Sequence, residues 1–165
     1  MVDADTELRI PREALARLEA EATAAYARDE EACGYLTCPA DDAQLADAPV
    51  ILANLANRYH ALDPEAYPRT GRTYFLIDPL KFAKAVTSGA SDGRPVRVLW
   101  HSHLDCGAYF SETDAAAATM GGDGPSYDLY YLVTSVRAGA VDDHKLFAWD
   151  ASTRAFVAAK LAILT

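Results

Sequence analysis

The chain of 165 residues carries 15 Lys and Arg against 24 Asp and Glu, a net charge of −9 without any basic run, which argues against binding to nucleic acid. No apolar stretch reaches the roughly 18 residues of a membrane span, and the first residues lack the features of a signal peptide, so neither a membrane protein nor a secreted one is expected. Three cysteines cannot all pair within one chain, and we expect reduced thiols, a cytoplasmic location and a single domain over residues 1–165.

Within the first 72 residues, the apolar pattern predicts three strands, one helix and a long loop. A short strand ends at Pro11, and a helix with a regular apolar face covers residues 12–30. Two further strands are expected at residues 32–38 and 50–57. The loop is expected at residues 58–72, which are rich in Pro, Arg and Tyr and have no clear period.

The rest of the chain alternates strands and helices. We predict a strand at residues 73–77, followed by a helix with Asp78 as N-cap, Pro79 as first residue and Gly89 as its end. We then expect a buried strand at residues 94–103, a helix at residues 111–122 and two strands joined by a turn at residues 127–150. The tail at residues 154–164 is expected to form a strand or a helix. This order predicts an α/β domain in which helices pack on a mixed sheet.

The strongest candidate site is the stretch HSHLDCGAYFSETD at residues 101–114. Side chains alternate along a strand, so the imidazoles of His101 and His103 point to the same face and make good zinc donors. Asp114, in the first turn of the next helix, can supply a carboxylate as third ligand and leave a fourth position for water. Ser111 and Asp114 alone also make a capping box, and both interpretations hold together because the cap fixes where the carboxylate lies.

Hydrolysis at zinc also needs a general base beside the attacking water. Glu31 is the candidate, at the junction of the first helix and the apolar strand that follows it. The alternative is a solvated carboxylate at a helix end, which is the expectation for the neighbouring Glu30. Spacing alone does not decide between the two.

These residues resemble the JAMM (MPN+, JAB) family of metalloproteases. The stretch at residues 101–114 fits the family signature His-Ser-His-x7-Ser-x2-Asp without a gap, and EACGYL at residues 31–36 resembles the Glu-x-x-Gly segment. The order of elements is similar over roughly residues 8–150. The resemblance implies the small bacterial or archaeal single-domain type, with a cytidine-deaminase-like (MPN/JAB1) fold: a curved mixed β-sheet with flanking helices.

The resemblance also implies a role for each matching residue. His101, His103 and Asp114 would bind Zn2+. Glu31 would hold and deprotonate the attacking water and pass its proton to the leaving amine. Ser111 would donate a hydrogen bond to the oxyanion. The expected activity is that of a zinc metallopeptidase.

The implied substrate is a ubiquitin-like or sulfur-carrier protein, cut after its C-terminal Gly-Gly. One branch of such enzymes releases cysteine from a carrier–cysteine adduct, and the eukaryotic branch cuts ubiquitin isopeptide bonds. An extended tail would bind alongside an exposed strand edge near the site. Two other functions fit the same sequence: a non-catalytic MPN scaffold without metal, and a zinc amidohydrolase acting on a small molecule or a cell-wall peptide. The sequence predicts no oligomeric state.

Cysteines and aromatic residues near the motif give further hypotheses. Cys106 is either an incidental loop residue or a thiolate that reaches the open zinc position, or oxidises, and inhibits the enzyme. Cys33 and Cys38 are expected to be buried. Tyr109 and Phe110 either pack on the loop or wall a groove for a Gly-Gly tail.

The loop at residues 58–72 lies where family members carry an insertion that contacts substrate. Its arginines are either solvated or bind an acidic carrier surface or a carboxylate: Arg58, Arg69 and Arg72. His60 and His144 have no partner at motif spacing, and neither is expected to bind metal.

Overall fold

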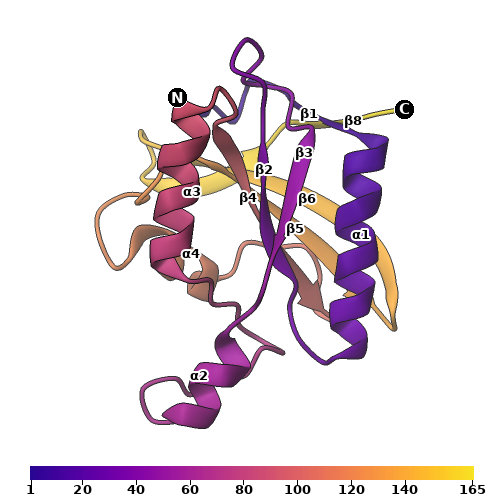
Figure 1. Ribbon diagram of the computed structural model, residues 1–165, viewed down its shortest axis with the longest axis vertical. Coiled ribbons are helices and arrows are strands. Elements are labelled where there is room, and N and C mark those ends of the chain that lie inside the picture. Colours follow the sequence, from indigo (N-terminus) through magenta and orange to yellow (C-terminus); the bar gives the residue numbers. More distant parts are fainter.

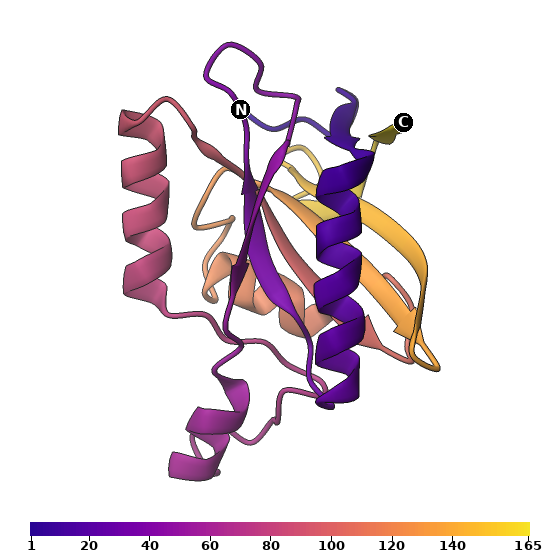
Figure 2. The ribbon, with the colours of Figure 1, turned by 45° about the vertical axis from the view of Figure 1, so that its right-hand side comes forward.

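The computed structural model describes residues 1–165 and places a six-stranded mixed sheet between two layers of helices (Figure 1). Helix α1 (Arg12–Ala27) covers one face, and α3 (Pro79–Ser91) and α4 (Glu112–Thr119) lie on the other. The short helix α2 (Ala56–Leu62) projects from one end of the molecule (Figure 2). This architecture confirms the predicted fold class. No helix combines the length and apolar composition that crossing a bilayer requires.

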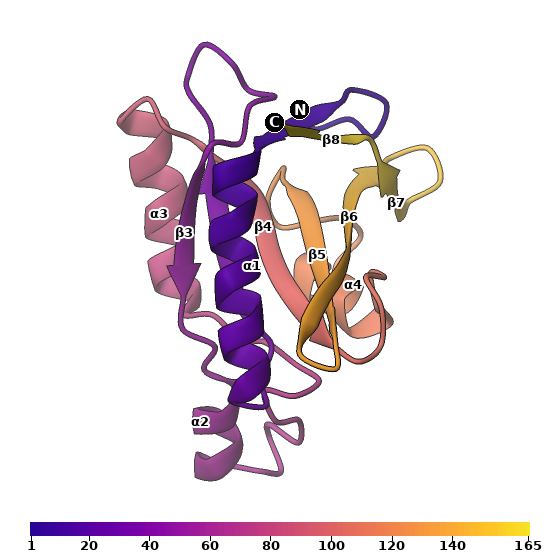
Figure 3. The same cartoon turned by 90° about the vertical axis from the view of Figure 1, so that its right-hand side faces the viewer.

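The sheet has the strand order β3-β2-β4-β5-β6-β7, in which β4 and β5 are parallel and all other neighbours antiparallel. Its strands, from β2 to β7, are Cys33–Thr37, Ala48–Leu52, Val96–Leu104, Tyr130–Arg137, Ala140–Asp150 and Ala155–Ala159. Two further strands, β1 (Leu8–Pro11) and β8 (Leu161–Leu164), form a separate parallel pair, so the first and the last strand of the chain lie side by side (Figure 3). The tail therefore forms two strands and no helix.

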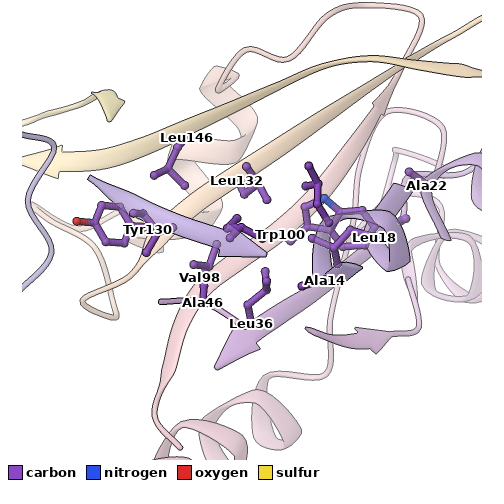
Figure 4. Packing of buried hydrophobic residues seen from close by; sticks show 14 of the residues in the cluster. Ala14, Leu18, Ala22, Leu36, Ala46, Val98, Trp100, Tyr130, Leu132 and Leu146 are labelled. Carbon is purple, nitrogen blue, oxygen red and sulfur yellow. The ribbon is translucent and has the colours of Figure 1, made fainter. Parts of the chain in front are cut away.

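Each face of the sheet has its own apolar core. The larger core joins α1 to the sheet, with Leu18 and Ala22 of the helix near Leu36, Trp100 and Leu132 (Figure 4). The predicted apolar face of α1 is buried along its length because its residues recur at helical spacing. The smaller core lies under α3 on the opposite face and includes Phe82, Leu99 and Tyr131.

The alternation of β4 between these two cores decides where its last residues point. Trp100 faces the α1 core, whereas Leu99 packs against the core under α3. His101 and His103 follow Leu99 at every second residue of β4, so their imidazoles lie on the α3 and α4 side of the sheet. Ser102 points to the α1 side, where its Oγ accepts the N–H of Ala32 at 2.8 Å.

The structure corrects the predictions for residues 50–77. Strand β3 ends at Leu52, and α2 occupies the start of the predicted loop. This helix buries only Ala56 and has no side-chain N-cap, so neither of the usual helix signals was present. Tyr74–Ile77 is extended but joins no sheet, because the side chain of Asn54 bonds the carbonyl of Tyr74 and the N–H of Leu76 instead.

Helix α3 starts as predicted and ends later. The carboxylate of Asp78 accepts the N–H groups of Leu80 and Lys81, and Pro79 is the first helical residue. The helix then continues past Gly89, which was expected to end it. A side chain at Gly89 would collide with the carbonyl oxygen of Arg94, so this glycine permits a close backbone approach inside the helix.

Candidate metal centre

Two buried imidazoles form the floor of the candidate site. The Nε2 atoms of His101 and His103 lie 3.1 Å apart at the end of β4. The Nδ1 of His103 donates to the carbonyl oxygen of Gly107 at 2.8 Å, which leaves its Nε2 lone pair free for a metal. Burial lowers the pKa of His101, although the charge of Asp114 opposes this, and the neutral imidazole is the form that binds a metal.

Asp114 joins the two histidines through the start of α4. The capping box is complete: Asp114 N–H donates to Ser111 Oγ, and Ser111 N–H donates to Asp114 Oδ2, both at 3.0 Å. The same Oδ2 lies 3.1 Å from Nε2 of His101 and 3.3 Å from Nε2 of His103. The cap and the metal interpretation of this segment are thus compatible, because the capped turn holds the carboxylate against the imidazoles.

Glu31 is the second carboxylate of the site. It is only 4% exposed, and one of its oxygens lies within 4.8 Å of a nitrogen of each histidine. Its Oε1 has no hydrogen-bond partner. Burial, and then the charge of Asp114, raise the pKa of Glu31 well above its usual value. A solvated helix-end carboxylate is therefore the wrong description of Glu31, whereas Glu30 pairs with Arg28 at 3.0 Å.

Hydrogen bonds to the backbone of Glu31 and Ala32 hold Glu31 in place, and their partners were not identified from the sequence. Glu31 N–H donates to the carbonyl of Gly71 at 2.6 Å, and Asn54 Nδ2 donates to the carbonyl of Glu31 at 2.9 Å. The third is the bond from Ala32 N–H to Ser102. Asn54, one of two asparagines in the apolar run ILANLAN, was the only sign of the contact with the Glu31 carbonyl.

Gly34 explains the glycine of the Glu-x-x-Gly segment. It pairs with Ile51 between β2 and β3, where an added Cβ would collide with the backbone carbonyl oxygen of Val50.

We therefore expect Gly34→Ala to lower the free energy of unfolding by about 2 kcal/mol or more in a urea titration. The control is Gly124→Ala, whose added methyl would make only ordinary contact with Trp149 and should change stability by less than about 0.5 kcal/mol. Equal effects of the two variants would contradict this explanation.

The donor set fits a zinc ion. Two donors that each lie about 2.0–2.1 Å from a tetrahedral zinc are separated by about 3.3 Å. The separations among His101 Nε2, His103 Nε2 and Asp114 Oδ2 are 3.1, 3.1 and 3.3 Å. Glu31 is the other carboxylate within reach of the histidines, but Asp114 is in closer contact with both.

Comparison with known protein families matches residues 11–151 to the prokaryotic homologs of the JAB domain. The chain belongs to this family. Comparison of the JAB protein with curated proteins gave no match.

Solved structures agree with the JAB fold. The protein is similar to a solution structure from Desulfitobacterium hafniense (20% identity, TM-score 0.65, covering 94% of this chain and 92% of the other). It is also similar to a solution structure from Salinibacter ruber (19%, TM-score 0.61, 94% and 91%). A crystal structure of a JAB1/MPN domain protein from Archaeoglobus fulgidus matches at 16% identity and TM-score 0.54, covering 96% and 100%. At these identities the likeness concerns the fold.

An apolar pocket of about 420 Å³ opens beside the candidate metal centre of the JAB protein. His101 and Asp114 form part of its wall, and 13 of its 17 lining residues are hydrophobic. The segment Tyr74–Ile77 forms another part of the wall. On the side facing Asn54 its backbone is bonded, whereas the N–H and C=O groups of Phe75 and Ile77 make no hydrogen bond. The segment therefore offers a free main-chain edge next to the pocket.

The remaining histidines have other partners. His60 Nδ1 donates to the carbonyl of Tyr67, and His144 lies between Thr134 and Glu19. Neither belongs to the group of residues that could hold a metal ion.

The cysteines are all free, with Cys33 and Cys38 buried as predicted and Cys106 exposed. Local burial raises the pKa of the Cys106 thiol, although a hydrogen bond from Tyr109 opposes this. A gain of activity with reductant, abolished by Cys106→Ser, stays a prediction. Phe110 packs against Phe156, whereas Tyr109 is 49% exposed.

Proposed function

We propose that this protein is a zinc-dependent JAMM-type peptidase that hydrolyses the amide bond after the C-terminal Gly-Gly of a ubiquitin-like sulfur-carrier protein. The observation that carries the proposal is the convergence of His101, His103 and Asp114 next to the buried, unpartnered Oε1 of Glu31. Burying a carboxyl oxygen without a partner is costly. A partner-binding scaffold gains nothing from a buried carboxyl oxygen without a partner, whereas a hydrolase needs a carboxyl that is free to bind water.

Each polar side chain then has one task. His101, His103 and Asp114 would hold the zinc ion, which when bound would polarise the scissile carbonyl. Glu31 Oε1 would accept a proton from the attacking water and deliver it to the leaving amine. The Ser111 hydroxyl already accepts the N–H of Asp114, and its hydrogen would donate to the oxyanion.

The surroundings of the site favour a peptide tail over a small polar molecule. An extended chain can pair with the free backbone groups of Phe75 and Ile77 and place alternate side chains in the apolar pocket. The Phe75 ring stacks on His101 at 4.5 Å between centroids, and the Tyr109 ring lies 5.0 Å from that of His103. A ring stacked on His101 and a ring edge-on to His103 leave little room for side chains at the scissile bond, which suits glycine.

Intact-mass spectrometry of a sulfur carrier extended by one residue after its Gly-Gly tests the proposal. The zinc-loaded protein should remove that residue, and a chelator should stop the reaction. A protein that purifies without stoichiometric zinc and cleaves nothing would be a scaffold. Cleavage of cell-wall peptides or small amides, with the carrier left intact, would identify an amidohydrolase.

A further inference from the structure

Two arginines of the segment at residues 58–72, Arg58 and Arg69, lack an acidic partner, although the chain has a net charge of −9. Arg72 pairs with Asp29 and Asp105 and so ties the insertion to the body of the protein. The exposed side chain of Arg69 makes a single hydrogen bond, from Nη1 to the carbonyl of Thr73 at 3.3 Å, and no ion pair. Its guanidinium is therefore free to bind an anion.

Arg69 lies beside the candidate general base. It precedes by two residues Gly71, whose carbonyl oxygen accepts the N–H of Glu31 at 2.6 Å. The positive charge of Arg69 also lowers the pKa of both Glu31 and Tyr74, although burial raises both more strongly. The guanidinium itself donates to the carbonyl oxygen of Thr73, the residue before Tyr74, and Tyr74 forms part of the wall of the apolar pocket.

The role of Glu31 defines which part of a substrate would meet this guanidinium. Glu31 would deliver its proton to the leaving amine, so groups beside Glu31 face the leaving residue. When that residue is the last of a linear chain, its free carboxylate is two bonds from the leaving nitrogen. In an isopeptide, a flexible lysine side chain separates the leaving nitrogen from the main chain. An arginine beside Glu31 can therefore bind a carboxylate in the first case and not in the second.

We propose that Arg69 is a specificity-determining residue that binds the free α-carboxylate of the leaving residue. The protein then removes a C-terminal residue from a carrier in preference to cutting isopeptide bonds. A guanidinium binds a carboxylate through two parallel hydrogen bonds, which supplies both affinity and orientation. This inference rests on the proposed function.

The test compares two forms of a sulfur carrier extended after its Gly-Gly by one phenylalanine, one with a free carboxylate and one with a C-terminal amide. We expect the wild-type protein to cleave the acid at least about tenfold faster than the amide in kcat/KM. Arg69→Ala should cleave both forms at the rate of the wild-type protein on the amide, and Arg69→Lys should recover part of the preference. Arg58→Ala, on α2, removes the same charge from an exposed site without a partner and should retain the full preference.

Binding supplies a second readout that does not depend on turnover. In a Glu31→Gln background, the acid should bind at least about tenfold more tightly than the amide, and Arg69→Ala should abolish the difference. Equal cleavage of acid and amide by the wild-type protein would overturn the role of Arg69 and leave the proposed function intact. An equal loss of both activities in Arg69→Ala would also overturn it. Failure of the wild-type protein to cleave either form would reject the proposed function itself.

Discussion

Glu31→Gln is expected to reduce kcat/KM for the extended carrier by about 10²–10⁴-fold while zinc stays bound. The amide keeps the size of the carboxyl but cannot accept a proton from water. Because Glu31 is buried with an unpartnered Oε1, its neutral replacement should not destabilise the fold. The measurements are initial rates with the zinc-loaded protein, zinc content and thermal unfolding.

Glu30→Gln is the matched control for that variant. Glu30 is the adjacent carboxylate, but it pairs with Arg28 and does not belong to the group around the histidines. Its replacement should leave kcat/KM within about twofold of wild type, because an exposed ion pair contributes little. A Glu31→Gln protein with more than a tenth of wild-type activity would contradict the assignment of the base. Loss of zinc from the Glu31→Gln variant would indicate that Glu31 is a zinc ligand and not the base.

Asp114→Asn is expected to weaken zinc binding on the order of 100-fold or more. Altering a residue that only orients a metal ligand already lowers metal affinity by about 10- to 100-fold, and loss of a ligand itself should lower it further. Asparagine can still accept the N–H of Ser111, so the helix start should survive. Zinc that binds only the folded protein raises its melting temperature. The zinc-loaded wild type should therefore melt above the variant, and a chelator should remove most of the difference.

Glu112→Gln is the control for charge in the same helical turn. Glu112 is exposed and belongs to no group that could hold a metal. Its replacement should leave zinc affinity and the chelator response as in wild type. If Asp114→Asn bound zinc as tightly as wild type, or if its lower melting temperature persisted in chelator, Asp114 would serve α4 as a cap alone.

Local rules predicted the parts of the site that depend on neighbours in sequence. Strand alternation correctly placed His101 and His103 on one face, because the period of two is a property of the backbone. The cap of α4 was likewise readable from Ser111 and Asp114, three residues apart. These segments keep their local preferences in the fold because tertiary contacts agree with them.

The parts that were missed depend on contacts between distant segments. Glu31 is buried because its backbone forms hydrogen bonds with Gly71 and Asn54, which lie far along the chain. Local sequence patterns do not predict such contacts. The extended segment Tyr74–Ile77 resembles a strand in sequence, yet its partner is the side chain of Asn54 and not a neighbouring strand. The pocket and its free main-chain edge follow from that same arrangement.

The two carboxylates beside the histidine pair, Asp114 and Glu31, are proposed to have different tasks. Anomalous X-ray scattering at the zinc absorption edge from crystals of the zinc-loaded protein tests it most directly. We expect one zinc ion bonded to His101, His103 and Asp114, with Glu31 outside bonding distance and in contact with water. An ion bonded to Glu31 with Asp114 left outside, or no ion at the histidine pair, would contradict it.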